Sequence, residues 1–226
     1  MKKLLAVVLF TCLATTVFAI DLSAGIGATV GSFSQTKNTE DDSPIAYARN
    51  EVWATVPFGF SAYFDATYGV AAIGFKANGN THYKSTLVVG ASTFITESDD
   101  DNRAGFLSFS LLGRYPFTLG PVSLFPLAGI EYDVNLYWKD VDGYDLKASL
   151  TDQQKADLNQ FWFKFGVGAD IGVYKGLYAR PLVLLGFKLL NQEERDDLES
   201  TISSGATVAR KTDFLFEGGV QVGWRF

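Results

Sequence analysis

The chain has 226 residues and a mass of 24.7 kDa, which suits one domain of ordinary size. Hydrophobic residues make up 47% and charged residues 19%, a composition too apolar for a disordered chain. The formal net charge of −6 disfavours nucleic acid as a partner, and the single cysteine, Cys12, excludes an internal disulfide framework.

The beginning of the chain predicts export. Two lysines precede an apolar run over residues 4–13, and Val17-Phe18-Ala19 offers small residues at the spacing of a cleavage site. We therefore expect a secretory signal peptide over residues 1–19 and one domain over residues 20–226. A lipoprotein processed before Cys12 is the alternative, which Phe10 and Thr11 between Leu9 and Cys12 disfavour.

The rest of the chain offers strands, and not a helix, for crossing a membrane. Its longest charge-free run, residues 115–130, has 16 residues and is interrupted by three prolines. Other charge-free runs, such as 52–64 and 104–113, are about as long as one tilted membrane strand, ~9–11 residues. Because a bilayer admits only helices or closed barrels, these runs favour a barrel.

Alternation of apolar and polar residues supports the barrel. In residues 163–171, Phe, Val, Ala and Ile occupy the odd positions and oppose Lys164, Asp170 and glycines at the even ones. A soluble β-sandwich also alternates, but its core would exclude charges of both signs. We therefore predict an all-β fold: a single eight-stranded antiparallel transmembrane β-barrel, with ten strands as the alternative.

The connections orient the barrel. Short turns of the kind found at the periplasmic end are expected at residues 65–66, 118–120 and 175–176. Long polar loops, expected outside the cell, are residues 34–49, 139–160 and 191–209. The acidic loop 96–103 is expected on the same side. A capping-box pattern that begins at Thr151 predicts a short extracellular helix over residues 152–159.

The strand count leaves one region ambiguous. Residues 66–95 hold two strand-like runs around Asn78-Gly79-Asn80. We expect one run to form the third strand and the other to belong to its extracellular extension or hairpin. Pro57 is awkward in this scheme, because a closed barrel has no edge strand to hold a proline.

The charges on the polar face are the candidate functional residues. The expected lumen-facing set is Arg114, Glu131, Asp133, Lys164, Asp170, Arg180, Lys188, Asp213, Glu217 and Arg225. An eight-stranded barrel has an interior just wide enough for side chains to fill, so the balanced signs indicate a structural ion-pair network. A polar constriction in a permeation path is the alternative. The expected periplasmic aromatic girdle and assembly signal consist of Tyr115, Phe117, Trp224 and Phe226.

Several runs resemble small bacterial outer-membrane barrels. They include Leu111-Leu112-Gly113-Arg114-Tyr115-Pro116-Phe117 and the closing Gly223-Trp224-Arg225-Phe226. The chain is similar in these runs to spirochaete-type barrels related to the outer-membrane protein W (OmpW-like) family. The resemblance implies eight strands, a narrow and partly apolar lumen, and passage of small hydrophobic molecules.

Enzymatic and metal sites are not expected. His82 and Ser85 are three positions apart, so alternation places them on opposite faces, and His82 is expected to be a solvated loop or turn residue. The acidic runs 40–42, 99–101 and 193–197 lack the spacing of a calcium loop and are expected to be solvated. We predict no catalytic residue, no metal ligand and no cofactor.

These observations give a functional expectation. We expect a porin-like, surface-exposed barrel in the bacterial outer membrane, which passes or binds small, hydrophobic solutes. The alternative is a structural or host-facing surface protein with a plugged lumen, which acts through its acidic extracellular loops. The expected partners are outer-membrane lipids, the barrel-assembly machinery through the last strand, and small hydrophobic solutes.

Overall fold

The computed structural model describes residues 21–41, 47–189, 192–203 and 206–226. The predicted signal peptide lies outside these residues and stays a prediction. Within them, the helices are too short or too polar to cross a membrane. The elements are β1 (Ser23–Asp41), β2 (Tyr47–Ala66), β3 (Gly69–Val89), β4 (Ser92–Asp100), β5 (Arg103–Arg114), β6 (Phe117–Leu119), β7 (Val122–Lys139), η1 (Leu146–Ser149), α2 (Asp152–Asp157), β8 (Gln160–Tyr174), β9 (Leu177–Leu189), α3 (Gln192–Ser203) and β10 (Val208–Arg225).

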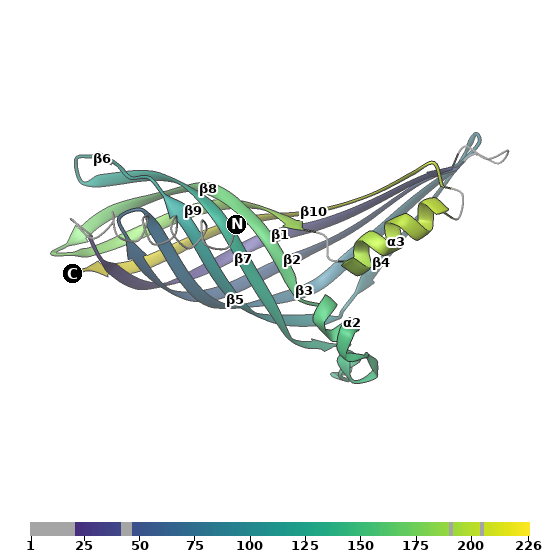
Figure 1. Cartoon of the computed structure of the whole chain (residues 1–226), viewed down its shortest axis with the longest axis horizontal. Coiled ribbons are helices and arrows are strands. Elements are labelled where there is room, and N and C mark those ends of the chain that lie inside the picture. The colour runs from purple at the N-terminus through teal and green to yellow at the C-terminus, as the bar shows by residue number, and fades with distance from the viewer. Residues whose placement is uncertain (1–20, 42–46, 190–191, 204–205) are drawn as a thin grey trace, which may run out of the picture.

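The strands close into a barrel (Figure 1). In the described part of the chain, β1, β2, β3, β5, β7, β8, β9 and β10 pair in an antiparallel ring of eight strands. The ring is sealed by β1 and β10, whose register runs from Ser23 opposite Arg225 to Glu40 opposite Val208. This confirms the predicted eight-stranded barrel, and β4 and β6 lie outside the ring.

The alternation predicted from the sequence divides each strand between the outside and the interior. On β8, Phe163 and Val167 are 44% and 60% exposed, whereas Lys164 is 1% exposed. The outer surface is therefore apolar and the charged side chains point inward. A barrel of the transmembrane class has this arrangement, because its outer face contacts lipid instead of water.

The sheet continues well beyond the barrel. We call the end at which Ser23 pairs with Arg225 the lower end and the opposite end the upper end. At the upper end, β1, β2, β3, β4 and β10 continue as a sheet that we call the extension (right in Figure 1). The prediction of loops at residues 34–49 and 96–103 was therefore wrong over most of their length, because polar strands at the same spacing pair there with one another.

The ambiguous region forms one long strand and a hairpin. β3 runs without interruption through Asn78-Gly79-Asn80, and β4 folds back on its upper half. Near Asn78 the side chains that face inward change from even to odd positions: Val70 is buried at the lower end of β3 and Ser85 near its upper end. This change of phase accompanies a β-bulge between Thr55 and Pro57 in the pairing of β2 with β3.

The same irregularity accommodates Pro57. The register of β1 with β2 passes from Val30 opposite Phe58 to Phe33 opposite Thr55, so Pro57 lies at a gap in this ladder too. A proline has no backbone N–H to donate, and a bulge is a place where a strand tolerates it.

The lower turns are tight. The first lies at Thr67 and Tyr68 instead of the predicted 65–66, because β2 continues to Ala66. The second is shifted to Gly120 and Pro121, and the predicted turn at Lys175 and Gly176 is confirmed. Gly120 and Gly176 have φ of +63° and +92°, which favours glycine.

Two of the long upper connections contain helices. Thr151 caps α2, and the capping box with Gln154 that the sequence predicts is present. The prediction of a loop over residues 191–209 was wrong for most of its length, because α3 occupies Gln192–Ser203.

Candidate functional site in the barrel interior

The lower end of the interior is filled by a cluster of arginines and aspartates. Nε of Arg180 donates to Oδ1 of Asp170 at 2.6 Å, and the guanidinium also contacts both carboxylate oxygens of Asp65. Nη1 of Arg114 lies 3.2 Å from Asp65 and 3.3 Å from Asp170, and Nη2 of Arg225 lies 3.2 Å from Asp170. We call these five residues the lower cluster.

Aromatic rings enclose the guanidinium of Arg180. Its central carbon lies 4.9 Å from the ring centre of Tyr63, 5.0 Å from that of Tyr178 and 5.2 Å from that of Phe125. The hydroxyl of Tyr63 donates to that of Tyr178 at 3.0 Å, which in turn donates to Oγ of Ser23 at 3.0 Å. Rings at this distance stabilise the cation, so the rings and the carboxylates together fix the position of the Arg180 guanidinium.

A second cluster of charges fills the middle of the barrel. Nζ of Lys164 lies 2.6 Å from Glu131 and also pairs with Glu217. Nζ of Lys76 lies 3.1 Å from Glu217 and 3.7 Å from Asp133, and it also pairs with Glu131. We call these five residues the middle cluster. Each lysine bridges two or more carboxylates from different strands, so the cluster ties the walls together across the lumen.

A third cluster joins α3 to the upper end of the barrel. Oε1 of Glu194 on α3 accepts from Nζ of Lys188 at 2.8 Å and from Nζ of Lys211 at 2.5 Å. Lys188 also lies 3.4 Å from Asp213, which accepts from Gln35 at 3.1 Å. Burial acts to raise the pKa of Glu194, but the hydrogen bonds and charges of Lys188 and Lys211 outweigh it and lower the pKa. We call these residues the upper cluster.

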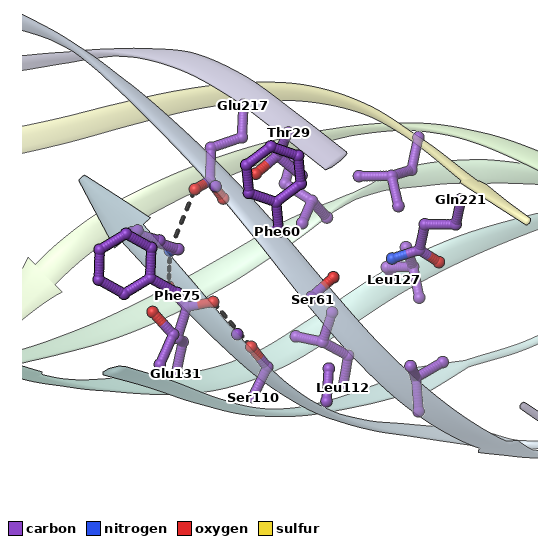
Figure 2. Close-up of a pocket in the computed structure, with 18 of the residues that line it drawn as sticks. Thr29, Phe60, Ser61, Phe75, Ser110, Leu112, Leu127, Glu131, Glu217 and Gln221 are labelled. Atoms are coloured by element: carbon purple, nitrogen blue, oxygen red, sulfur yellow. Dashed lines mark hydrogen bonds and ion pairs between the residues drawn. The ribbon is translucent and has the colours of Figure 1, made fainter. Parts of the chain in front are cut away.

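A small cavity separates the lower cluster from the middle cluster (Figure 2). Its volume is about 70 Å³, which is room for only a few water molecules. Arg180 borders it on one side and Lys76, Glu131 and Glu217 border it on the other. Leu112, Leu127, Leu182 and Leu184 from three strands form apolar parts of its wall. The described residues thus fill most of the lumen.

The structure places the predicted lumen residues as follows. Nine of the ten have buried or nearly buried side chains inside the barrel, and Arg225 is 46% exposed at the lower mouth. The sequence analysis does not identify Asp65 and Lys76 as lumen-facing residues, although each pairs with several charges of the lower or the middle cluster. Lys76 lies at an even position of β3 together with the inward Val70, so alternation alone could have found it. Asp65 was assigned to a turn, and the turn lies two residues further on.

The predicted girdle residues lie outside the barrel at its lower end. Tyr115, Phe117, Trp224 and Phe226 are 45–80% exposed. The ring of Tyr115 lies 5.1 Å from that of Phe117 and 6.0 Å from that of Tyr68. Contact with the membrane interface stays a prediction for these residues.

His82 is not a loop residue, contrary to the prediction. It lies on β3 in the extension, where its Nδ1 is 2.8 Å from Oδ1 of Asp99 on β4. Both side chains are exposed, at 54% and 76%. The described residues contain no group of three or more His, Cys, Asp or Glu side chains arranged to hold a metal ion.

No protein-family model matches the sequence, and no curated protein sequence matches it significantly. The structure is similar to the outer membrane protein OprG from Pseudomonas aeruginosa, with 12% identity and a TM-score of 0.35, over 90% of this chain and 97% of OprG. It is also similar to the outer membrane protease OmpT from Escherichia coli, with 8% identity and a TM-score of 0.34, over 91% of this chain and 97% of OmpT. For the translocator domain of the autotransporter NalP from Neisseria meningitidis, the identity is 10% and the TM-score 0.28, over 89% of this chain and 88% of that domain.

These likenesses are weak, and the assignment of a barrel depends on the strand pairings described above. The narrower resemblance to the OmpW-like family stays a prediction.

Proposed function

We propose that this chain is a surface protein of the bacterial outer membrane whose lumen is closed by its own side chains. In this proposal the barrel anchors the extension and its helices outside the cell. The observation that supports it is the filling of the lumen: the lower and middle clusters are separated by a cavity of only about 70 Å³. The geometry therefore favours the plugged-lumen alternative over free passage of solutes.

The outer surface supports the proposed location. Apolar side chains face outward around the ring, and a closed barrel leaves no unpaired strand edge in lipid. An exported chain of this kind would contact outer-membrane lipids along its apolar band. It would be inserted by the barrel-assembly machinery, which we expect to recognise β10.

We also propose that the protein is not an enzyme. The pair formed by His82 and Asp99 is solvated on the extension, and no described cavity has it in its lining. A general base works best when burial and neighbours tune it and hold a substrate beside it.

Electrical recording tests the closed lumen. The purified protein is inserted into a planar bilayer, after β-type circular dichroism and heat-modifiable gel migration have verified its folding. We expect no stable channel steps, because both clusters obstruct the path. Steady, stepwise conductance of the folded protein would contradict the closed lumen.

A second candidate function is the binding of a solute that does not pass through the barrel, and a separate pocket supports it. A pocket of about 450 Å³ lies between the inner face of the extension and α3, with Lys37, Arg49, Leu87 and Thr201 in its lining. This volume suits a small molecule. Binding without passage predicts that a solute raises the melting temperature of the protein while liposomes containing the protein do not swell in it.

A further inference from the structure

The strand β4 gives the extension an open edge. Its nine residues pair with β3 from Val89 to Thr81, and all nine are exposed. In the described part of the chain, no strand pairs with its other edge. The opposite edge of the extension, on β10, is instead accompanied by α3. An open edge presents backbone N–H and C=O groups with which a further strand can pair.

The template behind this edge is stiff. The upper half of β3 pairs with β4 on one side and with β2 on the other, and β2 continues the sheet to β1 and β10 (Figure 1). A strand added to β4 would therefore join an existing sheet, and little order would have to be created on binding.

The side chains of β4 define what can pair there. Phe94 and Ile95 are 57% and 60% exposed near its beginning. Its end carries Glu97, Asp99 and Asp100. Glu97 lies 2.6 Å from Lys84 and Asp99 lies 2.8 Å from His82, so neighbours on β3 fix the positions of both carboxylates. The edge thus combines an apolar start with an acidic end.

These charges disfavour a second copy as the occupant. Two copies in one membrane have the same up-and-down orientation, so their β4 strands would run in parallel. Pairing in register would then place Glu97 beside Glu97 and Asp99 beside Asp99, and like charges that face each other across strands are destabilising. A partner strand with basic side chains has the complementary charge.

We propose that β4 binds an extended, basic segment of a partner protein, which adds a strand to the extension. The inference rests on the proposed function of the barrel as an anchor for the extension. Backbone hydrogen bonds to β4 supply the affinity, and basic side chains opposite Glu97 and Asp99 supply the selectivity.

The test uses the full protein in detergent micelles and a synthetic nine-residue peptide in which lysine alternates with valine. A second peptide has the same sequence with its alternate backbone nitrogens methylated, which removes the donors on one edge and obstructs pairing. A third has glutamate in place of lysine. We expect the first peptide to bind, and binding by the methylated and acidic peptides to be weaker by about tenfold or more.

A pair of double variants provides the control. Glu97→Gln with Asp99→Asn should weaken binding of the lysine peptide by about tenfold. Asp142→Asn with Asp152→Asn removes the same charge from exposed positions in the β7–β8 connection and should leave binding unchanged. Equal binding by the methylated peptide, equal loss in both double variants, or no binding of any peptide would overturn the proposal. So would a dimer that dissociates in the β4 variant.

Channel conductance is measured on the same preparations. Conductance with intact peptide binding would overturn the closed lumen but leave the β4 edge standing. An absence of conductance together with an absence of peptide binding would overturn the proposal for β4 and leave the closed lumen standing.

Discussion

Lys164 shows what a single side chain does inside the barrel. It is 1% exposed and reaches Glu131 and Glu217 on two other strands. Taking a lysine out of water is costly unless carboxylates replace the water. If the lysine is removed, Glu131 and Glu217 remain as buried charges with fewer neighbours of opposite charge.

We therefore predict that Lys164→Met lowers the free energy of unfolding by about 3 kcal/mol, since breaking a buried pair leaves its partners uncompensated. Urea unfolding in detergent, followed by tryptophan fluorescence, measures the change. Asp100→Asn on the exposed β4 is the control and should change stability very little, because solvent screens such a charge. Unchanged stability in Lys164→Met would mean that water compensates the carboxylates.

A second prediction concerns the space beneath the tyrosines of the lower end. A Cβ at Gly223 would overlap the hydroxyl groups of Tyr63 and Tyr178. Gly223→Ala should destabilise the barrel by about 1–3 kcal/mol, because overpacking forces side chains out of their favoured rotamers. Gly218 lies on the same strand, and a Cβ there meets nothing within 4 Å, so Gly218→Ala is the matched control. Thermal unfolding of both variants decides whether the tyrosine pair is rigid.

At the scale of elements, the carboxylate of Glu194 joins α3 to two strands of the barrel sheet. Glu194 contacts Lys188 on β9 and Lys211 on β10. Its pKa is lowered from the ordinary value of 4.5, so docking favours the ionised form. The stabilisation is complete above the ordinary pKa and is lost as the pH falls through the lowered one.

We accordingly expect α3 to detach in acid. The protection factors of the α3 amides, which are the intrinsic exchange rates at each pH divided by the observed rates, should be high near neutral pH and decrease as the pH falls below about 4.5. Glu194→Gln should accelerate exchange by about tenfold at neutral pH, the effect of losing one charge-assisted hydrogen bond. Glu199→Gln changes an exposed residue of the same helix and should leave exchange unchanged. Similar rates in both variants would mean that other contacts hold the helix.

Elements inside the ring could be predicted from the sequence, and of those outside it only the short helix α2 could. Apolar residues alternate strongly along the strands of the ring, as at Phe163 and Phe165, so the positions of most ring strands could be predicted from the sequence, although the strand number stayed open between eight and ten. The extension has polar side chains on both faces, so residues 34–41 lack that contrast and were predicted as a loop. The phase change near Asn78 depends on a bulge in two neighbouring strands, which a local pattern does not encode.

The site was predictable only in part for a related reason. Alternation indicates that Lys164 and Glu217 point inward, but not that they meet. Their contact depends on strand register and on distances across the lumen, which are properties of the closed ring. The role of Lys76 as a bridge between Glu131 and Glu217 arises at the same level.

At the scale of the whole molecule, the even ring places the start of β1 and the end of β10 at the same end of the barrel. Ser23 pairs with Arg225, and the turn at Lys175 lies at the same end. α2 lies at the other end (Figure 1). If the extension is outside the cell, Ala148 faces the medium and Lys175 faces the periplasm.

Cysteine labelling tests this orientation. The sequence has one cysteine, Cys12, within the predicted signal peptide. In intact cells, a membrane-impermeant maleimide should label Ala148→Cys and spare Lys175→Cys, whereas both should react after lysis. Labelling of Lys175→Cys alone in intact cells would reverse the orientation.

The fluorescence of the buried Trp162 should depend on whether the lumen is closed. Its ring meets that of Phe33 edge to face at 5.8 Å, and it is 2% exposed. Beside it is a cavity of about 20 Å³ that Asp133 and Lys76 also line. In a variant with Trp53, Trp138 and Trp224 replaced by phenylalanine, emission from this indole should be blue and inaccessible to iodide while the barrel is closed. Any opening of the middle cluster would admit quencher, so Trp162 is a fluorescent reporter at the constriction of the lumen.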